Sequence, residues 1–139
     1  MILLDTNVVS EALRPAPDAK VLSWLDEQLC DALYLSAITV AELRLGTAVL
    51  PDGRKRDLLA DRLENRIFPL FEGRILAFDE PAAAVYAQIR STARKQGKAV
   101  AAADGYIAAT AKLHRMVVAT RDVSPFRAAG VKVVNPWSD

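Results

Sequence analysis

Short apolar runs alternate with longer helix-like segments along this chain, and that alternation restricts the fold more than any other feature. Each run has four or five residues, which suits a strand and is far too short to span a membrane. Strands joined by helices pair in parallel, and helices then cover both faces of the sheet. We therefore predict an α/β fold, a single domain over residues 1–139, with a five-stranded parallel sheet flanked by helices. The predicted strands are 2–5, 33–36, 74–78, 116–120 and 131–134.

Helix signals occupy the segments between these runs. Asp18 and Asp79 can each cap a helix, because an N-cap carboxylate accepts hydrogen bonds from the first free backbone N–H groups. Pro81 fits the first turn of the helix that Asp79 caps, and Gly97 fits its end. The predicted helices are 8–13, one capped by Asp18, 39–50, 54–67, one between Asp79 and Gly97, 102–115 and 125–129.

Composition excludes several classes of protein. The chain has 139 residues, 52% of them hydrophobic, which is enough for one domain with a core and too many for a disordered tail. The N-terminus lacks a basic segment and Asp5 interrupts its apolar run, so we expect neither a signal peptide nor a membrane span. The one cysteine, Cys30, cannot form an internal disulfide. We expect it to act as a small hydrophobic residue in a reducing cytoplasm.

The charge balance leaves a nucleic-acid substrate open. A formal net charge of +1 neither supports nor excludes one, so any basic footprint would have to be local. For most of the basic positions we favour a solvated helix face, with contacts to RNA as the alternative. The two basic groups are Arg54-Lys55-Arg56 and the set Arg90, Arg94, Lys95 and Lys98.

Four acidic residues lie where an apolar segment ends or a helix begins: Asp5, Glu42, Asp104 and Asp122. Ligands of open α/β sheets bind beyond the carboxyl ends of the strands, so these acids can converge at one edge. Neighbouring carboxylates resist ionising unless a cation neutralises them. Oxygen ligands without Cys or His nearby suit Mg²⁺ or Mn²⁺. The pattern therefore indicates metal-assisted chemistry on phosphate.

Each of these acids also has a purely structural interpretation. Asp5 can cap the following helix or form an Asx-turn, and Asp122 can belong to a simple turn. Glu42 matches a capping box with Thr39, in which the glutamate bonds back to the N–H of the cap. No single acid identifies a site, and it is their joint placement that favours the functional interpretation.

Asp104 and its neighbour raise a separate question. Asp104 can sit in the first turn of its helix, where negative charge is favoured. Gly105 is unusual in a helix interior, where it costs about 1 kcal/mol relative to Ala. Close approach of a substrate or another backbone would explain this glycine, and so would tight helix packing. Asp79, by contrast, precedes a proline-started helix and is assigned to capping alone.

Four acidic segments follow one another along the chain: Asp5-Thr6-Asn7, Thr39-Val40-Ala41-Glu42-Leu43, residues 102–111 (AADGYIAATA) and Thr120-Arg121-Asp122. In this order they resemble the PIN-domain ribonucleases. Three further segments are residues 34–46 (YLSAITVAELRLG), Gly73-Arg74-Ile75-Leu76 and Asn135-Pro136-Trp137. With them the likeness is greatest to the VapC-type toxins of type II toxin–antitoxin pairs, and especially to their FitB branch.

The resemblance implies a PIN-like fold over residues 1–139. It implies that the four acids form a catalytic and metal-binding pocket, that Thr120 supports this pocket and that Asn7 orients Asp5. Members of the family are usually homodimers, and a small antitoxin usually holds them inactive. In the FitB branch this antitoxin is similar to a ribbon-helix-helix DNA-binding protein.

The expected reaction is hydrolysis of single-stranded or looped RNA with Mg²⁺ or Mn²⁺. Asp5 and Asp104 are the first-choice direct ligands, whereas Glu42 and Asp122 ligate through water or hold a second ion. We expect the antitoxin to insert a basic side chain, an Arg, into the acidic pocket. Its apolar part would occupy a groove between the helices at 8–13 and 39–67.

Three alternatives compete with this interpretation. A haloacid-dehalogenase-like phosphatase needs a second acid two residues after Asp5, where this chain has Asn7, and a lysine near its third motif. A receiver-like regulatory domain needs adjacent acids after the first strand and a lysine after the fifth. A PIN fold that acts only through protein contacts is the third alternative, and the presence of all four acids argues against it.

Overall fold

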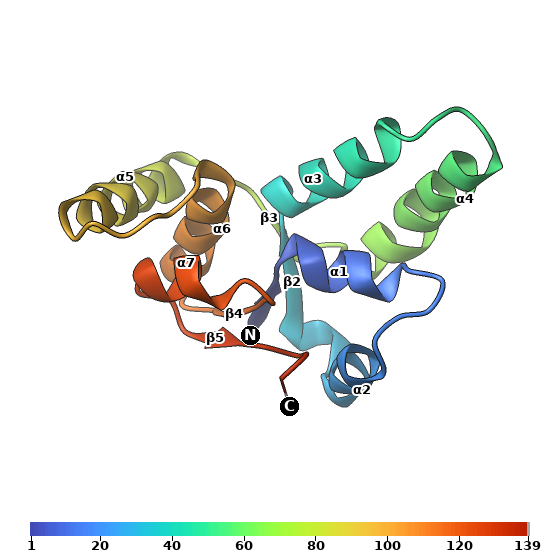
Figure 1. Ribbon diagram of the computed structural model, residues 1–139, viewed down its shortest axis with the longest axis horizontal. Helices are drawn as coiled ribbons and strands as arrows, with labels where there is room; N and C mark the ends of the chain where they lie inside the picture. The colour runs from blue at the N-terminus through green and yellow to red at the C-terminus, as the bar shows by residue number, and fades with distance from the viewer. Residues whose placement is uncertain (139) are drawn as a thin grey trace.

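The computed structural model describes residues 1–138, and in them a five-stranded parallel sheet forms the centre of the molecule. Its strand order is β3-β2-β1-β4-β5 (Figure 1). The predicted parallel sheet with flanking helices is therefore confirmed. The strands are β1 (Ile2–Leu4), β2 (Leu33–Ser36), β3 (Ile75–Leu76), β4 (Val117–Ala119) and β5 (Val133–Val134).

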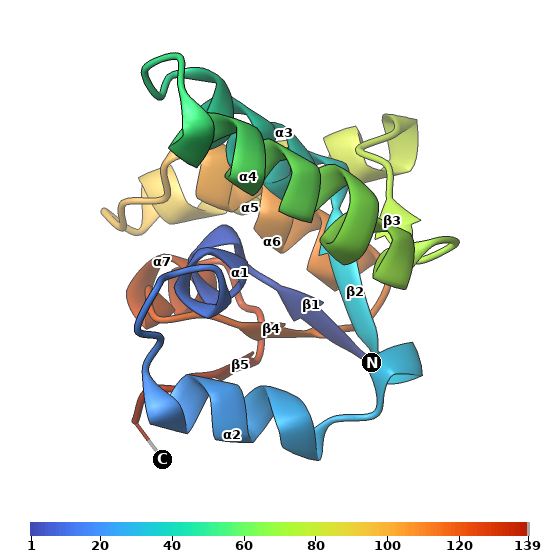
Figure 2. The same cartoon turned by 90° about the vertical axis from the view of Figure 1, so that its right-hand side faces the viewer.

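Seven α-helices cover this sheet within residues 1–138. Helices α5, α6 and α7 lie on one side and α1 to α4 on the other (Figures 1 and 2). They are α1 (Thr6–Ala12), α2 (Ala19–Glu27), α3 (Ala37–Ala48), α4 (Arg54–Arg62), α5 (Glu80–Lys95), α6 (Ala102–Leu113) and α7 (Val123–Ala128). A π-helical turn, Leu63–Ile67, and two 3₁₀ turns, Cys30–Ala32 and Phe68–Phe71, complete the regular structure.

The order of the strands decides where a site can form. From β1 the chain builds outward to β2 and β3 on one side, and then adds β4 and β5 on the other. The crevice at such a switch point, beyond the carboxyl ends of the strands, is the usual ligand position in open α/β sheets. Leu4 of β1 pairs with Ala119 of β4, so Asp5 and Thr120 leave the sheet side by side.

Two apolar cores pack against the two faces of the sheet. Successive side chains of a strand point to opposite faces, so Leu3 belongs to the core beneath α5, α6 and α7, and Leu4 to the core beneath α1 to α4. Val118 and Ala119 divide between the two cores in the same way. Val8 and Val9 of α1 are buried in the second core.

Local capping explains most helix boundaries. Asp18 and Asp79 are N-caps, and their carboxylates accept hydrogen bonds from the backbone N–H groups of Lys20 (2.8 Å) and Ala82 (3.1 Å), as predicted. Beyond the end of α5, Gly97 adopts a positive φ of 69°, a conformation that favours glycine and stops a helix.

Several predicted boundaries were wrong. The third strand was expected over 74–78 but contains only Ile75–Leu76, because β3 is an edge strand that pairs with β2 alone. The helix expected over 54–67 ends at Arg62 and continues as a π-helical turn. Cys30, expected to act as a small hydrophobic residue, is exposed.

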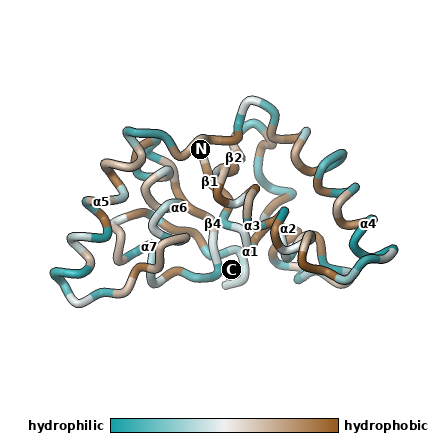
Figure 3. The backbone as a smooth tube through the Cα atoms, turned by 90° about the horizontal axis from the view of Figure 1, so that it is seen from above, coloured by the Kyte–Doolittle hydropathy of each residue, from teal (hydrophilic) through white to brown (hydrophobic). Residues whose placement is uncertain are grey.

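Figure 3 shows hydrophilic colour around the far end of α5 and hydrophobic colour along the central strands. In residues 1–138, every helix is too short or too polar to cross a membrane.

Candidate active site

Asp5 is the centre of the candidate site, and it is 5% exposed. Its Oδ1 accepts a hydrogen bond from the backbone N–H of Thr6 (2.8 Å), which makes Asp5 the N-cap of α1. Its Oδ2 accepts a hydrogen bond from the Thr120 hydroxyl (2.7 Å). The structural interpretation of Asp5 as a cap is therefore correct, but it accounts for only one of the two carboxylate oxygens.

Thr120, which follows β4, and Asn7 of α1 hold this carboxylate. Thr120 is fully buried, donates its one hydroxyl proton to Asp5 and accepts a hydrogen bond from the backbone N–H of Asp122 (2.9 Å). The Asn7 amide nitrogen lies 3.4 Å from both Asp5 Oδ2 and Thr120 Oγ1, and its oxygen accepts from the Arg121 N–H (3.3 Å). These contacts are those of residues that orient Asp5.

Burial and neighbouring charge make ionisation of Asp5 difficult. The pKa of Asp5 is raised to about 6, mainly because the side chain is buried and also because Asp104 and Glu42 are negatively charged. The hydrogen bonds from Thr120 and Thr6 act in the opposite direction. Carboxylates from three separate elements therefore act on one another at this edge of the sheet.

The hydrogen bond that holds Glu42 in the site was not predicted from the sequence. The capping box with Thr39 was wrong, because Ser36 is the N-cap of α3 and its hydroxyl accepts a hydrogen bond from the Thr39 N–H (3.0 Å). This places Glu42 in the second turn, where its Oε1 accepts a short hydrogen bond from the Thr6 hydroxyl (2.6 Å). Thr6 thus joins α1 to α3, although nothing in the sequence singled it out.

Asp104 and Asp122 approach from the other side of the sheet. Asp104 lies in the first turn of α6, as predicted, and burial raises its pKa. The charges of Asp122 and Glu42 raise the pKa of Asp104 as well. Asp122 precedes α7 but makes no capping bond with its side chain. All four predicted acids are therefore coupled electrostatically.

The donor chemistry of this cluster fits a hard divalent cation, because it consists of carboxylate oxygens whose mutual repulsion a cation would relieve. In the part of the chain that the structure describes, no three Asp, Glu, His or Cys side chains converge closely enough to share one ion. Mg²⁺ commonly keeps several waters and binds through one or two carboxylates, so full convergence is not required. Of the four, Asp104 and Asp122 accept no side-chain hydrogen bond within residues 1–138 that would hold them in place.

Gly105 is explained by helix packing. A Cβ at this position would lie 3.0 Å from Cε1 of Tyr86 and 3.3 Å from Cδ of Arg90, both on α5. The Tyr86 ring stacks on that of Tyr106 with centroids 4.5 Å apart. Of the explanations considered for this glycine, close packing between α5 and α6 is the one that the structure supports, and it occurs directly beside Asp104.

The raised pKa of Asp5 predicts how stability depends on pH without divalent metal. The folded state binds the proton of Asp5 more tightly than the unfolded state does, so protonation of Asp5 stabilises the fold. This contribution to stability is fully present below about pH 4 and is lost as pH rises through about 6. In EDTA, Asp5→Asn should therefore be more stable than wild type at about pH 8 by roughly 1–3 kcal/mol, and the difference should vanish near pH 4. Urea unfolding across this range measures it. Asp26→Asn, an exposed control on α2, should show no such trend.

Comparison with known proteins identifies the family to which this chain is similar. The PIN domain family model matches residues 2–132. The chain is 64% identical over 139 residues to Toxin FitB of Neisseria gonorrhoeae, covering 100% of both chains. It is 53% identical over 137 residues to VapC ribonuclease Y4jK of Sinorhizobium fredii, covering 99% of this chain and 98% of that protein.

A solved structure agrees with these two relatives. The crystal structure of FitAcB from Neisseria gonorrhoeae superposes with a TM-score of 0.98 at 63% identity, covering 100% of both chains. The family likeness therefore extends over the whole fold, including all the elements that carry the four acids. This chain belongs to the PIN-domain family.

Proposed function

We propose that this chain is a metal-dependent endoribonuclease and the toxin of a toxin–antitoxin pair. The observation that carries the proposal is the buried Asp5, whose ionisation is opposed by Asp104 and Glu42 at the switch point of the sheet. One relative of this chain is named a toxin and another a VapC ribonuclease. A self-repelling acidic pocket on this fold suits hydrolysis of RNA phosphodiester bonds.

Asp5 and Asp104 are the first-choice direct ligands for Mg²⁺ or Mn²⁺, with Glu42 and Asp122 acting through water or at a second ion. When bound, such an ion would lower the pKa of a water and offset charge on the phosphate. The chain itself holds Asp5 in place through Thr120 and Asn7, and holds Glu42 through Thr6. The expected products of in-line hydrolysis are a 3′-hydroxyl and a 5′-phosphate.

A phosphatase of the haloacid-dehalogenase type fits this site less well. Its second acid would stand at position 7, where the Asn7 amide is instead engaged with Asp5 and Thr120. Among the described residues, no lysine forms an ion pair with any of the four acids. An activity measurement separates an enzyme from the other alternative, a PIN fold that acts only through protein contacts.

That measurement is cleavage of a pool of cellular RNA by the purified chain, with Mg²⁺ or with EDTA, followed by mapping of the new ends. The proposal expects discrete cuts that carry 5′-phosphates and that appear only with the divalent ion. RNA left intact under both conditions, by folded protein freed of any partner, would contradict it.

A groove beside the acidic pocket is the surface we propose for an antitoxin. It encloses about 610 Å³ between α1, α3 and α4, close to the helices anticipated from the sequence. Its wall is mostly apolar, with Leu58 57% exposed. Its charged lining residues are Glu42, Arg14, Lys55 and Arg62. An amphipathic helix could lie in this groove and extend a basic side chain past Glu42 toward Asp5. We expect the partner to be a small protein of ribbon-helix-helix type that inserts an Arg, because the planar guanidinium pairs bidentately with carboxylates.

The proposed homodimer needs a different surface. Strand β3 is an edge of the sheet and carries the exposed Ile75, and Leu70 is exposed just before it. An apolar sheet edge of this kind favours contact with a second copy of the chain. The groove and this edge lie on separate elements, so antitoxin binding and dimer formation can coexist.

Gly46 offers a test of the groove. A Cβ at Gly46 would meet no atom within 4 Å, so Gly46→Trp should fill the groove without disturbing α3. Because anchor residues concentrate the energy of such interfaces, we expect antitoxin binding to weaken by at least about thirtyfold while RNA cleavage persists. Calorimetric titration with the antitoxin measures this change. Gly46→Ala is the matched control. It should bind normally and be more stable by about 1 kcal/mol, and unchanged binding by Gly46→Trp would remove the groove from the interface.

A further inference from the structure

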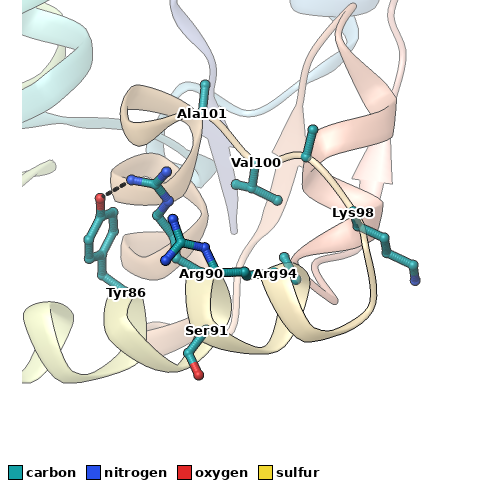
Figure 4. A pocket seen from close by; sticks show the side chains of 9 residues that line it. Tyr86, Arg90, Ser91, Arg94, Lys98, Val100 and Ala101 are labelled. Atoms are coloured by element: carbon teal, nitrogen blue, oxygen red, sulfur yellow. Dashed lines mark hydrogen bonds between the residues drawn. The ribbon is translucent and has the colours of Figure 1, made fainter.

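A basic hollow of about 740 Å³ lies beside the acidic pocket, between α5 and the loop that leads into α6. Figure 4 shows Arg90 and Arg94 next to each other on α5, with their guanidinium groups in the space between α5 and the start of α6. Lys98 extends outward from the loop at its rim. The floor is apolar, because Ala93 and Val100 are buried beneath the two arginines.

The charges of this hollow are not neutralised by the protein. Four other arginines of the chain form ion pairs with carboxylates: Arg14, Arg44, Arg56 and Arg74. Within residues 1–138, Arg90, Arg94 and Lys98 form none, and the lining of the hollow includes no acidic residue. An anion that entered here would therefore meet cations whose charge is still available.

One of the two arginines is held in place. The Arg90 guanidinium donates a hydrogen bond to the Tyr86 hydroxyl (2.8 Å) and lies 5.7 Å from the centre of the same ring. Tyr86 is itself fixed by stacking on Tyr106 and by edge contact with Phe78. A guanidinium ordered in this way loses less entropy on binding an anion than a freely moving side chain on a solvated helix face.

The position of the hollow connects it to the acidic pocket. Ala101 lines the hollow and is the N-cap of α6, and Asp104 follows within the first turn, about 5 Å further along the helix axis. The stem of Arg90 packs over Gly105, the residue after Asp104. A chain of linked phosphates that reached Asp104 would pass next to these cations.

From this arrangement we infer that Arg90 and Arg94 form a subsite for a backbone phosphate of single-stranded RNA, adjacent to the bond that the acidic pocket cleaves. The inference rests on the proposed ribonuclease function. Arg94 is one helical turn from Arg90, about 5–6 Å between Cβ atoms, so the two can act on one stretch of backbone. Contacts of this kind fix the register of the strand and carry no base specificity themselves.

The test uses an RNA oligonucleotide that spans a cut mapped in the cellular pool. Its binding is measured by fluorescence anisotropy at several NaCl concentrations, with Asp5→Asn as the uncleaving parent. Adding Arg90→Gln and Arg94→Gln keeps most of each stem and removes both charges. Affinity should fall on the order of tenfold, and the slope of log K against log salt should fall by about 0.7, the value for one phosphate of a single strand. Lys20→Gln with Lys132→Gln, both exposed and away from the hollow, removes equal charge and should change each value far less.

A modified oligonucleotide identifies the phosphate that Arg90 and Arg94 contact. One phosphate beside the cut is replaced by an uncharged methylphosphonate, in turn on each side. At one position this should weaken binding to the parent but not to the double-glutamine protein. Arg94→Gln alone should reproduce part of the loss, since no side-chain hydrogen bond of Arg94 is present in the described chain.

The possible failures are distinct. If wild type cuts no RNA, the proposed function fails and the subsite falls with it. If wild type cuts RNA but the double-glutamine and control proteins bind equally, the subsite alone is overturned. If the double-glutamine protein binds RNA as well as its parent but has a different sedimentation coefficient, the hollow is a contact between copies of the chain. That result also overturns the inference.

Discussion

Asp5→Asn and Asp104→Asn are each expected to reduce metal-dependent RNA cleavage by more than about 100-fold, the upper range for loss of a group that only supports a metal ligand. Both substitutions remove a carboxylate that we propose as a direct ligand while leaving side-chain volume almost unchanged. Asp5 is the acid whose ionisation the surrounding protein opposes most clearly, and Asp104 is one of the two charges that raise its pKa. Initial cleavage rates on the mapped oligonucleotide measure the effect.

Folding must be shown to survive in both variants. The charge of Asp5 is costly in the folded protein, so Asp5→Asn should melt no lower than wild type in EDTA. Asp26→Asn removes an exposed acid from α2 and should keep full activity. Wild-type cleavage by either Asp5→Asn or Asp104→Asn would exclude that residue from the mechanism.

The general fold was predictable because its signals are local. Runs of apolar residues mark β1, β2 and β4, and Asp18 and Asp79 cap helices through N–H groups only a few residues away. The placement of the four acids at one edge then follows from parallel pairing, because the carboxyl ends of parallel strands lie together. None of these steps requires knowledge of distant contacts.

The predictions that failed depended on a choice between neighbours or on distant contacts. Ser36 and Thr39 are both suitable caps, and the extended backbone of Ser36 (φ −91°, ψ 154°) made Ser36 the cap of α3. Glu42 is therefore free to accept the hydrogen bond from Thr6, a residue 36 positions away. No local pattern encodes such a contact.

The basic residues show the same limit. Arg90 and Arg94 looked like part of a solvated helix face, since four-residue spacing on α5 indicates only that they share a side. What distinguishes them is the packing of Tyr86 against Gly105 and Tyr106, which joins α5 to α6 and places the stem of Arg90 over Gly105, next to Asp104 in the chain. The glycine was a visible signal of close packing, but its partner could not be read from the sequence.

Divalent metal should stabilise the folded chain strongly, because the acidic cluster exists only when the chain is folded. At a hundredfold excess over the dissociation constant, Mg²⁺ or Mn²⁺ would contribute about 2.7 kcal/mol and raise the melting temperature by roughly 5–10 °C. Part of this gain comes from relieving the repulsion that Asp104 and Glu42 exert on Asp5. Thermal melts with the divalent chloride, against NaCl at equal ionic strength, measure the shift. In the Asp5→Asn/Asp104→Asn double variant the shift should disappear, whereas in Asp26→Asn it should remain. An equal shift in the double variant and in wild type would place the ion elsewhere on the molecule and leave the acidic pocket without its proposed metal.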